Sequence, residues 1–254
     1  MIQSVQPPAH RAAFAAAIQG VPCLHALLGR DLALWADNPG APVRLFLAET
    51  AALALSGSTA TLCGSLSADG WEELRSFLRF TGTQVLRSTT PAPWGTAATP
   101  LTCYGLAAGE RLFLPPAPAG LTPDDAPPIG EVARFLFSEH PAQQDAFYSA
   151  TCSAAARGMA RCWALRDAAG ALVCTVQADA LHDGEACLAM GRTSPALRGQ
   201  GIGGWHIASC ANALAAQGWR VSFLCYPERC RFYDRLGFRQ IDTFNEYQID
   251  GNTR

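Results

Sequence analysis

The stretch ALRGQGIGGWHIASCANALAAQ, residues 196–217, decides the fold of this chain. Its glycine-rich centre, Arg198 to Gly204, follows an apolar run at 186–190 and precedes a run with helical character at 205–217. The order strand, glycine turn, helix matters because the first N–H groups of a helix have no partner inside the helix. Those groups and the helix dipole attract anions, and glycines let the backbone approach a ligand closely. The residues alone therefore predict a phosphate cradle, with an ordinary glycine loop as the alternative.

Composition limits the classes of protein that this chain can represent. Of its 254 residues, 49% are hydrophobic and 16% are charged, which predicts one large folded domain or two small ones. The formal net charge is −2, all 19 basic residues are Arg, and basic runs are absent, which argues against a nucleic-acid partner. No apolar run reaches the roughly 18 residues of a membrane span, and no secretory signal is recognisable. We therefore expect a cytoplasmic protein that does not bind membranes.

The 10 cysteines form no C-x-x-C pair, and most of them lie in apolar runs. In the cytoplasm they are expected to be reduced, and a Cys in an apolar run behaves as a small buried hydrophobe. The pattern therefore predicts no zinc site and no other metal site.

The middle of the chain is rich in proline, and residues 115–128 read PPAPAGLTPDDAPP. This composition is typical of a linker. We predict an N-terminal α/β domain at 1–115, a Pro-rich linker at 116–128 and a C-terminal domain at 129–254. The C-terminal domain reads as two helices, a meander of three strands, then helix, strand, helix and strand, which is an α/β order with a mixed sheet.

Two motifs of this domain resemble those of the GCN5-related N-acetyltransferases (GNATs). Arg198-Gly199-Gln200-Gly201-Ile202-Gly203 is similar to the R/Q-x-x-G-x-G/A pyrophosphate loop of that family. The segment RFYDRLGF at 231–238 resembles its F/L-Y-x-x-x-G-F segment, about thirty residues downstream. Two motifs in the right order are far more specific than either alone, and the resemblance covers roughly residues 129–249.

The resemblance implies a GNAT fold with acetyl-CoA as co-substrate. In such a fold two neighbouring strands splay apart, and the exposed edge at 189–193 would pair with the pantetheine arm. The amides of the glycine turn would hold the pyrophosphate, Gln200 would be a further phosphate contact, and Ile202 would pack in the core. The binding residues implied in this way are Gly191, Arg192, Thr193, Arg198, Gly199, Gln200, Gly201, Ile202, Gly203 and Gly204.

Tyr233 corresponds to the tyrosine that serves as general acid in the family. A phenol has an ordinary pKa of about 10 and can protonate a leaving thiolate at neutral pH. From the residue alone, an aromatic side chain that fills the core is the alternative. The resemblance thus implies transfer of acetyl from acetyl-CoA, by direct attack, to a primary amine of a small molecule or peptide. A homodimer remains open.

The sequence departs from the family pattern seven residues before Tyr233. Many relatives carry Asn there, whereas this chain has Tyr226, which puts the contact from that Asn to CoA in doubt. The central strand at 186–190 carries no acid, so we assign no general base. Glu228 reads as a helix-start acid, and Cys225 as a buried thiol. A non-catalytic acyl-CoA sensor is therefore the alternative function.

Two further expectations concern a histidine and the first half of the chain. His206 lies near a helix start, where a cationic side chain is disfavoured, so we expect it to be neutral. Residues 40–88 also read strand, hairpin, helix, strand, but no R-x-x-G-x-G occurs between Cys63 and Trp71. Our hypothesis is that the N-terminal half is a degenerate GNAT-like copy that no longer binds CoA and covers one wall of the acceptor cleft. It requires a mixed sheet with a helix on each face within 1–115.

Overall fold

The structure, a computed structural model, describes residues 1–38, 40–94 and 97–249. The chain divides into two compact units. The N-terminal unit comprises Met1–Cys103, Leu224–Glu228 and Ile241–Arg254. The C-terminal unit comprises Tyr104–Phe223 and Arg229–Gln240. Residues 250–254 of the predicted domain 129–254 lie outside the described part of the chain.

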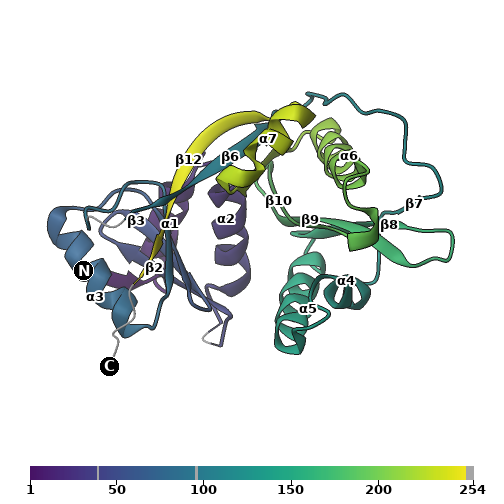
Figure 1. Cartoon of the computed structure of the whole chain (residues 1–254). Coiled ribbons are helices and arrows are strands. Elements are labelled where there is room, and N and C mark those ends of the chain that lie inside the picture. Colours follow the sequence, from purple (N-terminus) through teal and green to yellow (C-terminus); the bar gives the residue numbers. More distant parts are fainter. Residues whose placement is uncertain (39, 95–96, 250–254) are drawn as a thin grey trace. The chain divides into compact units, whose positions relative to one another are not determined.

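The N-terminal unit is a mixed sheet with helices on both faces (Figure 1). Its elements in chain order are β1 (Ile2–Ser4), α1 (Pro8–Ile18), α2 (Leu24–Trp35), β2 (Val43–Ala48), β3 (Ala51–Ser56), β4 (Thr59–Cys63), α3 (Ala68–Phe80) and β5 (Val85–Ser88). Strands β1 to β4 are antiparallel neighbours, and β5 pairs with β4 in parallel. The mixed sheet with a helix on each face, which the hypothesis of a degenerate copy requires, is thus present in this half.

Side chains that alternate along the strands build the two cores of this unit. Leu53 and Leu62 are fully buried against Leu74 and Leu78 of α3. On the other face, α1 and α2 pack on the strands through an apolar stripe that includes Phe14. Ser67 caps α3, because its hydroxyl accepts a hydrogen bond from the Gly70 amide at 3.1 Å.

The C-terminal unit repeats this order of elements. Its elements are β7 (Thr122–Asp124), α4 (Ile129–Leu136), α5 (Pro141–Ala155), β8 (Arg161–Arg166), β9 (Leu172–His182), β10 (Glu185–Thr193), a 3₁₀ turn (Pro195–Leu197) and α6 (Ile202–Ala216). Strands β7 to β10 are antiparallel neighbours, and β11 (Arg220–Cys225) pairs with β10 in parallel. Helix α6 covers one face of this sheet, and α4 and α5 cover the other (Figure 1).

Four elements contribute residues to both units: β6 (Thr99–Leu106), β11, α7 (Pro227–Leu236) and β12 (Arg239–Gln248). The last residues of β12, Asn245 to Gln248, pair with β5, which places this part of β12 in the N-terminal unit. Residues 104–115, in turn, fall in the C-terminal unit. The predicted domain boundaries at 115 and 129 stay a prediction, and the compact units divide the chain differently.

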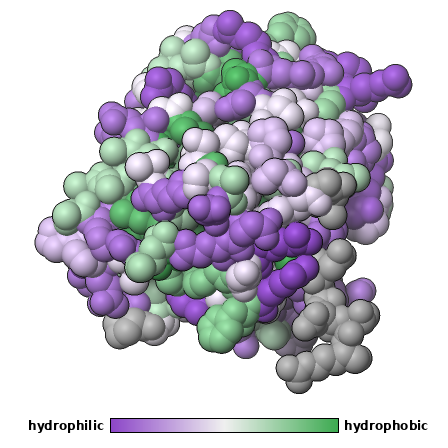
Figure 2. All heavy atoms as spheres, turned by 90° about the vertical axis from the view of Figure 1, so that its left-hand side faces the viewer, coloured by the Kyte–Doolittle hydropathy of each residue, from purple (hydrophilic) through white to green (hydrophobic). Residues whose placement is uncertain are grey.

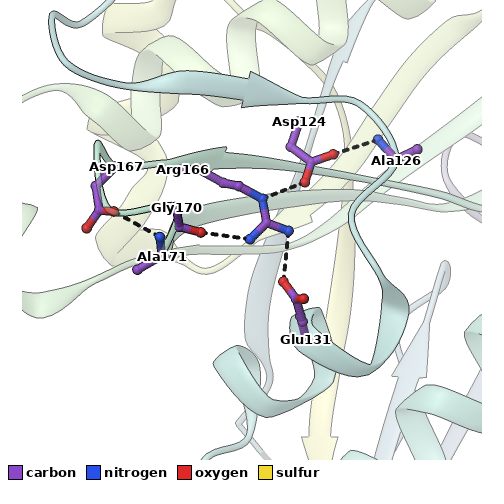
Figure 3. A network of polar contacts seen from close by, with 7 residues as sticks. All are labelled: Asp124, Ala126, Glu131, Arg166, Asp167, Gly170 and Ala171. Carbon is purple, nitrogen blue, oxygen red and sulfur yellow. Dashed lines mark hydrogen bonds and ion pairs between the residues drawn. The ribbon is translucent and has the colours of Figure 1, made fainter.

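The predicted Pro-rich linker contains the edge strand β7, which Arg166 ties to its neighbours (Figure 3). The Arg166 guanidinium donates to the Asp124 carboxylate at 2.7 Å, to the Glu131 carboxylate at 2.8 Å and to the Gly170 carbonyl at 2.9 Å. One side chain thereby joins β7, the first turn of α4 and the turn between β8 and β9. A planar fork of donors suits such a junction, which a lysine could not reproduce.

Replacing Arg166 by methionine should lower the thermal midpoint of unfolding by a few degrees, because it leaves Asp124 and Glu131 without their shared partner. The measurement is thermal unfolding followed by circular dichroism. Arg157→Met is the matched control, since the Arg157 side chain makes no polar contact with the described residues. Equal midpoints for the two variants would show that the Arg166 network adds nothing to stability.

One face of the molecule mixes apolar and hydrophilic residues (Figure 2). On the face drawn in Figure 2, apolar residues form small separate patches among hydrophilic ones. Within the part of the chain that the structure describes, no helix has both the length and the hydropathy that crossing a membrane requires.

Candidate functional site

Strands β10 and β11 separate before the glycine turn. They pair at Glu185–Arg220, Ala186–Val221 and Cys187–Ser222, and the ladder between them ends there. Strand β10 nevertheless continues to Thr193, and its other edge stays paired with β9. Residues 188–193 therefore present a strand edge on the β11 side with no ladder partner among the described residues. Such an edge can pair with an extended ligand that carries amide groups.

A β-bulge interrupts β10 along this open edge. The pairing with β9 shifts register between Ala189 and Arg192, and Met190 has a φ of 53°. The hydroxyl of the buried Thr175 donates to the Met190 carbonyl at 3.2 Å and so supports the bulge. A non-glycine residue at positive φ costs about 1–3 kcal/mol, and bulges of this kind are common beside active sites. The sequence pattern did not predict this bulge.

The glycine turn leaves a run of backbone amides without acceptors. Gly199 and Gly201 have φ values of 77° and 78°, and Gly201 is the N-cap of α6. The first hydrogen bond of the helix runs from the Trp205 amide to the Gly201 carbonyl at 2.9 Å. Among the described residues no acceptor serves the N–H groups of residues 199–204. A Cβ at Gly199 or Gly201 would meet no atom within 4 Å, so these glycines are required by backbone conformation and not by crowding.

The next two glycines have a different purpose, because they allow close packing. A Cβ at Gly203 would lie 2.7 Å from the hydroxyl oxygen of Thr193. A Cβ at Gly204 would lie 3.1 Å from a methyl carbon of Leu236 and 3.5 Å from the ring of Phe232. The first turn of α6 therefore packs directly against β10 and against α7, the helix that carries Tyr233.

The side chains predicted to bind the cofactor point in several directions. Arg198 is exposed at the turn and donates from Nε to the Thr193 carbonyl at 3.2 Å, while Gln200 bonds the Ala196 carbonyl at 3.4 Å. Ile202 is buried in the core, as expected, which leaves its amide alone for a ligand. The guanidinium of Arg192 bonds the Leu136 carbonyl, so a role of Arg192 in binding would have to come from its backbone. Gly191 is exposed on the open edge of β10.

Tyr233 belongs to a cluster of aromatic rings in the C-terminal unit. Its ring centroid lies 4.5 Å from that of Phe223, 5.0 Å from that of Phe232 and 5.5 Å from that of Tyr104. The side chain is half-buried, so its ring packs in this cluster while part of it stays accessible to solvent. The packing interpretation of Tyr233 is thus correct for the ring, and it does not conflict with a chemical role for the hydroxyl.

Comparison with solved structures identifies the fold. The chain is similar to a GCN5-related N-acetyltransferase from Kribbella flavida, with 18% identity over 82% of this chain and 90% of that chain and a TM-score of 0.59. The chain has the GNAT fold. A tandem GNAT protein from the clavulanic acid biosynthesis pathway aligns over 99% of both chains, with 16% identity and a TM-score of 0.62. A GCN5-related N-acetyltransferase from Sphaerobacter thermophilus aligns over 99% of this chain and 96% of that chain, with 14% identity and a TM-score of 0.64. Searches of protein-family models and of curated proteins find no match.

The N-terminal unit has a GNAT-like order of elements, but the segment that corresponds to the glycine turn, between β4 and α3, offers neither an open strand edge nor a free helix start. The ladder between β4 and β5 runs to Leu62–Ser88, one residue before β4 ends. At the start of α3, the Glu49 carboxylate accepts from the Ser67 amide at 3.0 Å and from the Ser67 hydroxyl. These hydrogen bonds hold the pKa of Glu49 below its usual range. The carboxylate of Glu49 thus occupies the N-terminal end of α3, whereas the amides at the start of α6 have no such partner among the described residues.

Tyr226, which replaces the family Asn, is engaged elsewhere. Its hydroxyl donates to the carboxylate of the buried Glu246, with O···O distances of 3.0 and 3.1 Å. The same carboxylate accepts from Arg87 Nε at 2.8 Å. Tyr226 therefore contributes to an ion-pair cluster of the N-terminal unit, in keeping with the doubt about a contact to CoA at this position.

Acids and thiols near β10 have structural partners. Glu185 is buried and forms an ion pair with Arg220. Glu228 is an exposed acid in the first turn of α7, as expected. Cys225 is buried, which confirms the prediction for that thiol. Elsewhere in the chain, burial raises the pKa of the Cys63 and Cys162 thiols to about 12. Among the described residues no cluster of three His, Cys, Asp or Glu side chains could hold a metal ion.

His206 lies in the core beneath the glycine turn. It is 4% exposed, and burial lowers its pKa from 6.5 to about 4, so the expectation of a neutral side chain is confirmed. Its Nε2 atom has no hydrogen-bond partner among the described residues. The imidazole thus resists protonation because a buried cation here would have little to compensate the loss of water.

This burial predicts an acid-sensitive fold. Because the folded-state pKa of about 4 lies below the usual 6.5, the unfolded chain takes up the proton first as the pH falls. The stabilisation is fully present above pH 6.5 and is lost as the pH falls towards 4, a difference of about 3 kcal/mol. Urea unfolding of His206→Met between pH 7 and 4 should show a weaker pH dependence than the wild type. The exposed His140→Gln serves as control, and a His206→Met profile parallel to the wild type would refute this assignment.

Proposed function

We propose that the chain is an N-acetyltransferase that transfers acetyl from acetyl-CoA to a primary amine of a small molecule or peptide. The observation that carries the proposal is the open edge of β10, which leads directly into a turn whose amides have no acceptor. An extended ligand arm that carries amide groups and is joined at one end to a pyrophosphate matches this combination. The resemblance of both sequence motifs to the GNAT family supports the same function.

The residues fit acetyl-CoA as a substrate. In this proposal the amides of residues 199–204 hold the pyrophosphate, and Arg198 adds a charged donor at the exposed side of the turn. The backbone of residues 189–193, which includes Gly191, Arg192 and Thr193, orients the pantetheine arm along the edge of β10. Acetyl-CoA supplies a thioester, whose carbonyl carbon accepts the amine nitrogen.

Tyr233 holds the proton that the departing sulfur takes up. The packing of α7 against Gly204 supports this role, because it brings the helix of Tyr233 to the first turn of α6. The attacking amine must be neutral, and the acid–base group that deprotonates it stays unassigned. The cytoplasm stays the predicted compartment.

Two measurements test the proposal and separate it from the sensor alternative. Acetyl-CoA at about 100 times its dissociation constant should stabilise the fold by about 2.7 kcal/mol in thermal unfolding. Incubation of the protein and acetyl-CoA with a panel of primary amines and peptides should then release the free thiol of CoA, which a thiol reagent detects. Absence of any thermal shift would exclude both functions. Binding without thiol release from any acceptor would favour the sensor.

A further inference from the structure

We propose that Tyr104 is a positioning residue for Tyr233, holding helix α7 so that the acid faces the reacting sulfur. The inference rests on the proposed function. Tyr104 lies on β6, in residues that the sequence assigns to the N-terminal domain, yet it belongs to the C-terminal unit together with residues 229–236 of α7. It is fully buried, which is unusual for a side chain that carries a hydroxyl group.

The hydroxyl of Tyr104 is bonded to the backbone and a side chain of α7. Its oxygen lies 2.7 Å from a carboxylate oxygen of Asp234 and 3.1 Å from the Cys230 carbonyl, both of which are acceptors. The amide of Gln240 donates to the same oxygen at 3.1 Å and to the Asp234 carboxylate at 3.3 Å. Cys230 lies one helical turn before Tyr233 and Asp234 directly follows it. The hydroxyl therefore fixes the turn of α7 from which Tyr233 projects.

The ring of Tyr104 adds a direct contact. It stacks on Phe223 at 5.8 Å with an interplanar angle of 15°, and it lies 5.5 Å from the ring of Tyr233 at 42°. Burial, together with the Asp234 hydrogen bond, raises the pKa of Tyr104 above its usual value, so its hydroxyl stays a donor through the neutral pH range. Tyr104 thus acts on α7 through packing and through a permanent hydrogen-bond donor.

The Tyr104 hydroxyl and apolar packing together hold α7 in place. No residue of this helix is buried among those described, and its apolar contacts come from partly exposed side chains such as Phe232 and Leu236. A shift of about 1 Å in a catalytic group can cost up to a hundredfold in rate, even when the group itself is intact. Loss of the Tyr104 hydroxyl should therefore reduce turnover much more than it reduces acetyl-CoA affinity, because the amides of the glycine turn lie at the start of α6 and not on α7.

The test is Tyr104→Phe, which keeps the ring and removes the hydroxyl. We expect kcat for thiol release to fall roughly tenfold to a hundredfold, while the dissociation constant for acetyl-CoA changes less than about twofold. Amides of α7 should exchange hydrogen about tenfold faster in the absence of ligand. Tyr247→Phe is the matched control, since Tyr247 is also buried and its hydroxyl accepts from the Ala92 amide at 2.9 Å.

The outcomes separate this inference from the proposed function. A wild type that binds acetyl-CoA but acetylates no amine of the panel would favour the sensor over the transferase, and hydrogen exchange in α7 would then show whether the Tyr104 hydroxyl holds that helix. A Tyr104→Phe variant with the turnover of Tyr247→Phe would overturn the inference and leave the transferase standing. Unchanged exchange in α7, or a fall in acetyl-CoA affinity as large as the fall in kcat, would also overturn it.

Discussion

Gly201→Val should weaken acetyl-CoA binding by about a hundredfold or more. Gly201 is the N-cap of α6 with a φ of 78°, a conformation that a β-branched residue rarely adopts. Valine would either rotate the amides of the turn away from the pyrophosphate or place two methyl groups beside it. Losing one or two charge-assisted hydrogen bonds costs about 3 kcal/mol, which corresponds to about a hundredfold in affinity. Isothermal titration calorimetry with acetyl-CoA measures the effect.

Gly218→Val is the matched control for this prediction. Gly218 follows the other end of α6, its φ is 91°, and a Cβ there would meet no atom within 4 Å. The two variants should lose similar stability, because both force a branched residue into a left-handed conformation. Only the change at 201 should weaken binding. Equal affinities for both variants would mean that the turn does not hold the ligand.

Tyr233→Phe should reduce kcat by about a hundredfold or more while acetyl-CoA affinity stays the same. General acid catalysis by a positioned side chain contributes about 10²–10⁴-fold, and phenylalanine cannot donate a proton. The ring contacts with Phe223 and Phe232 do not involve the hydroxyl, so the helix should keep its place. Steady-state rates of thiol release and calorimetric affinities together separate chemistry from binding.

Tyr148→Phe provides the comparison for Tyr233→Phe. Tyr148 lies on α5 and is 50% exposed, so loss of its hydroxyl should leave turnover and affinity unchanged. A Tyr233→Phe variant as active as Tyr148→Phe would remove the general acid from the proposal and reduce Tyr233 to a packing residue.

The local features of the site could be predicted from the sequence because they depend on neighbouring residues. A run of glycines between an apolar strand and a helix predicts the turn, and the left-handed φ of Gly199 and Gly201 follows from their lack of a Cβ. The run with helical character was expected at 205–217, but the helix begins at Ile202, since Gly203 and Gly204 fit inside its first turn. Glycine is needed at these two positions because they pack closely against Thr193 and Leu236, and a local sequence pattern cannot reveal such contacts.

Features that depend on distant residues could not be predicted. Tyr104 contacts its partners on α7 across 126 and 130 residues of chain, and no local sequence pattern links residues so far apart. Strand β7 lies in a Pro-rich segment, and its three residues are too few to show an alternation of apolar and polar side chains. Its position is fixed by pairing with β8 and by the contact with Arg166. The final strand was expected in the C-terminal domain, but its pairing with β5 assigns most of it to the N-terminal unit.

We propose that the glycine turn of the C-terminal unit holds the pyrophosphate of an acyl-CoA, and a crystal structure of the full chain with CoA is the decisive test. The expected result is one CoA per chain, with phosphate oxygens within hydrogen-bond distance of amides in residues 199–204 and the pantetheine arm along 189–193. CoA bound at the start of α3 instead, or phosphates away from the turn, would show that the turn does not hold the pyrophosphate.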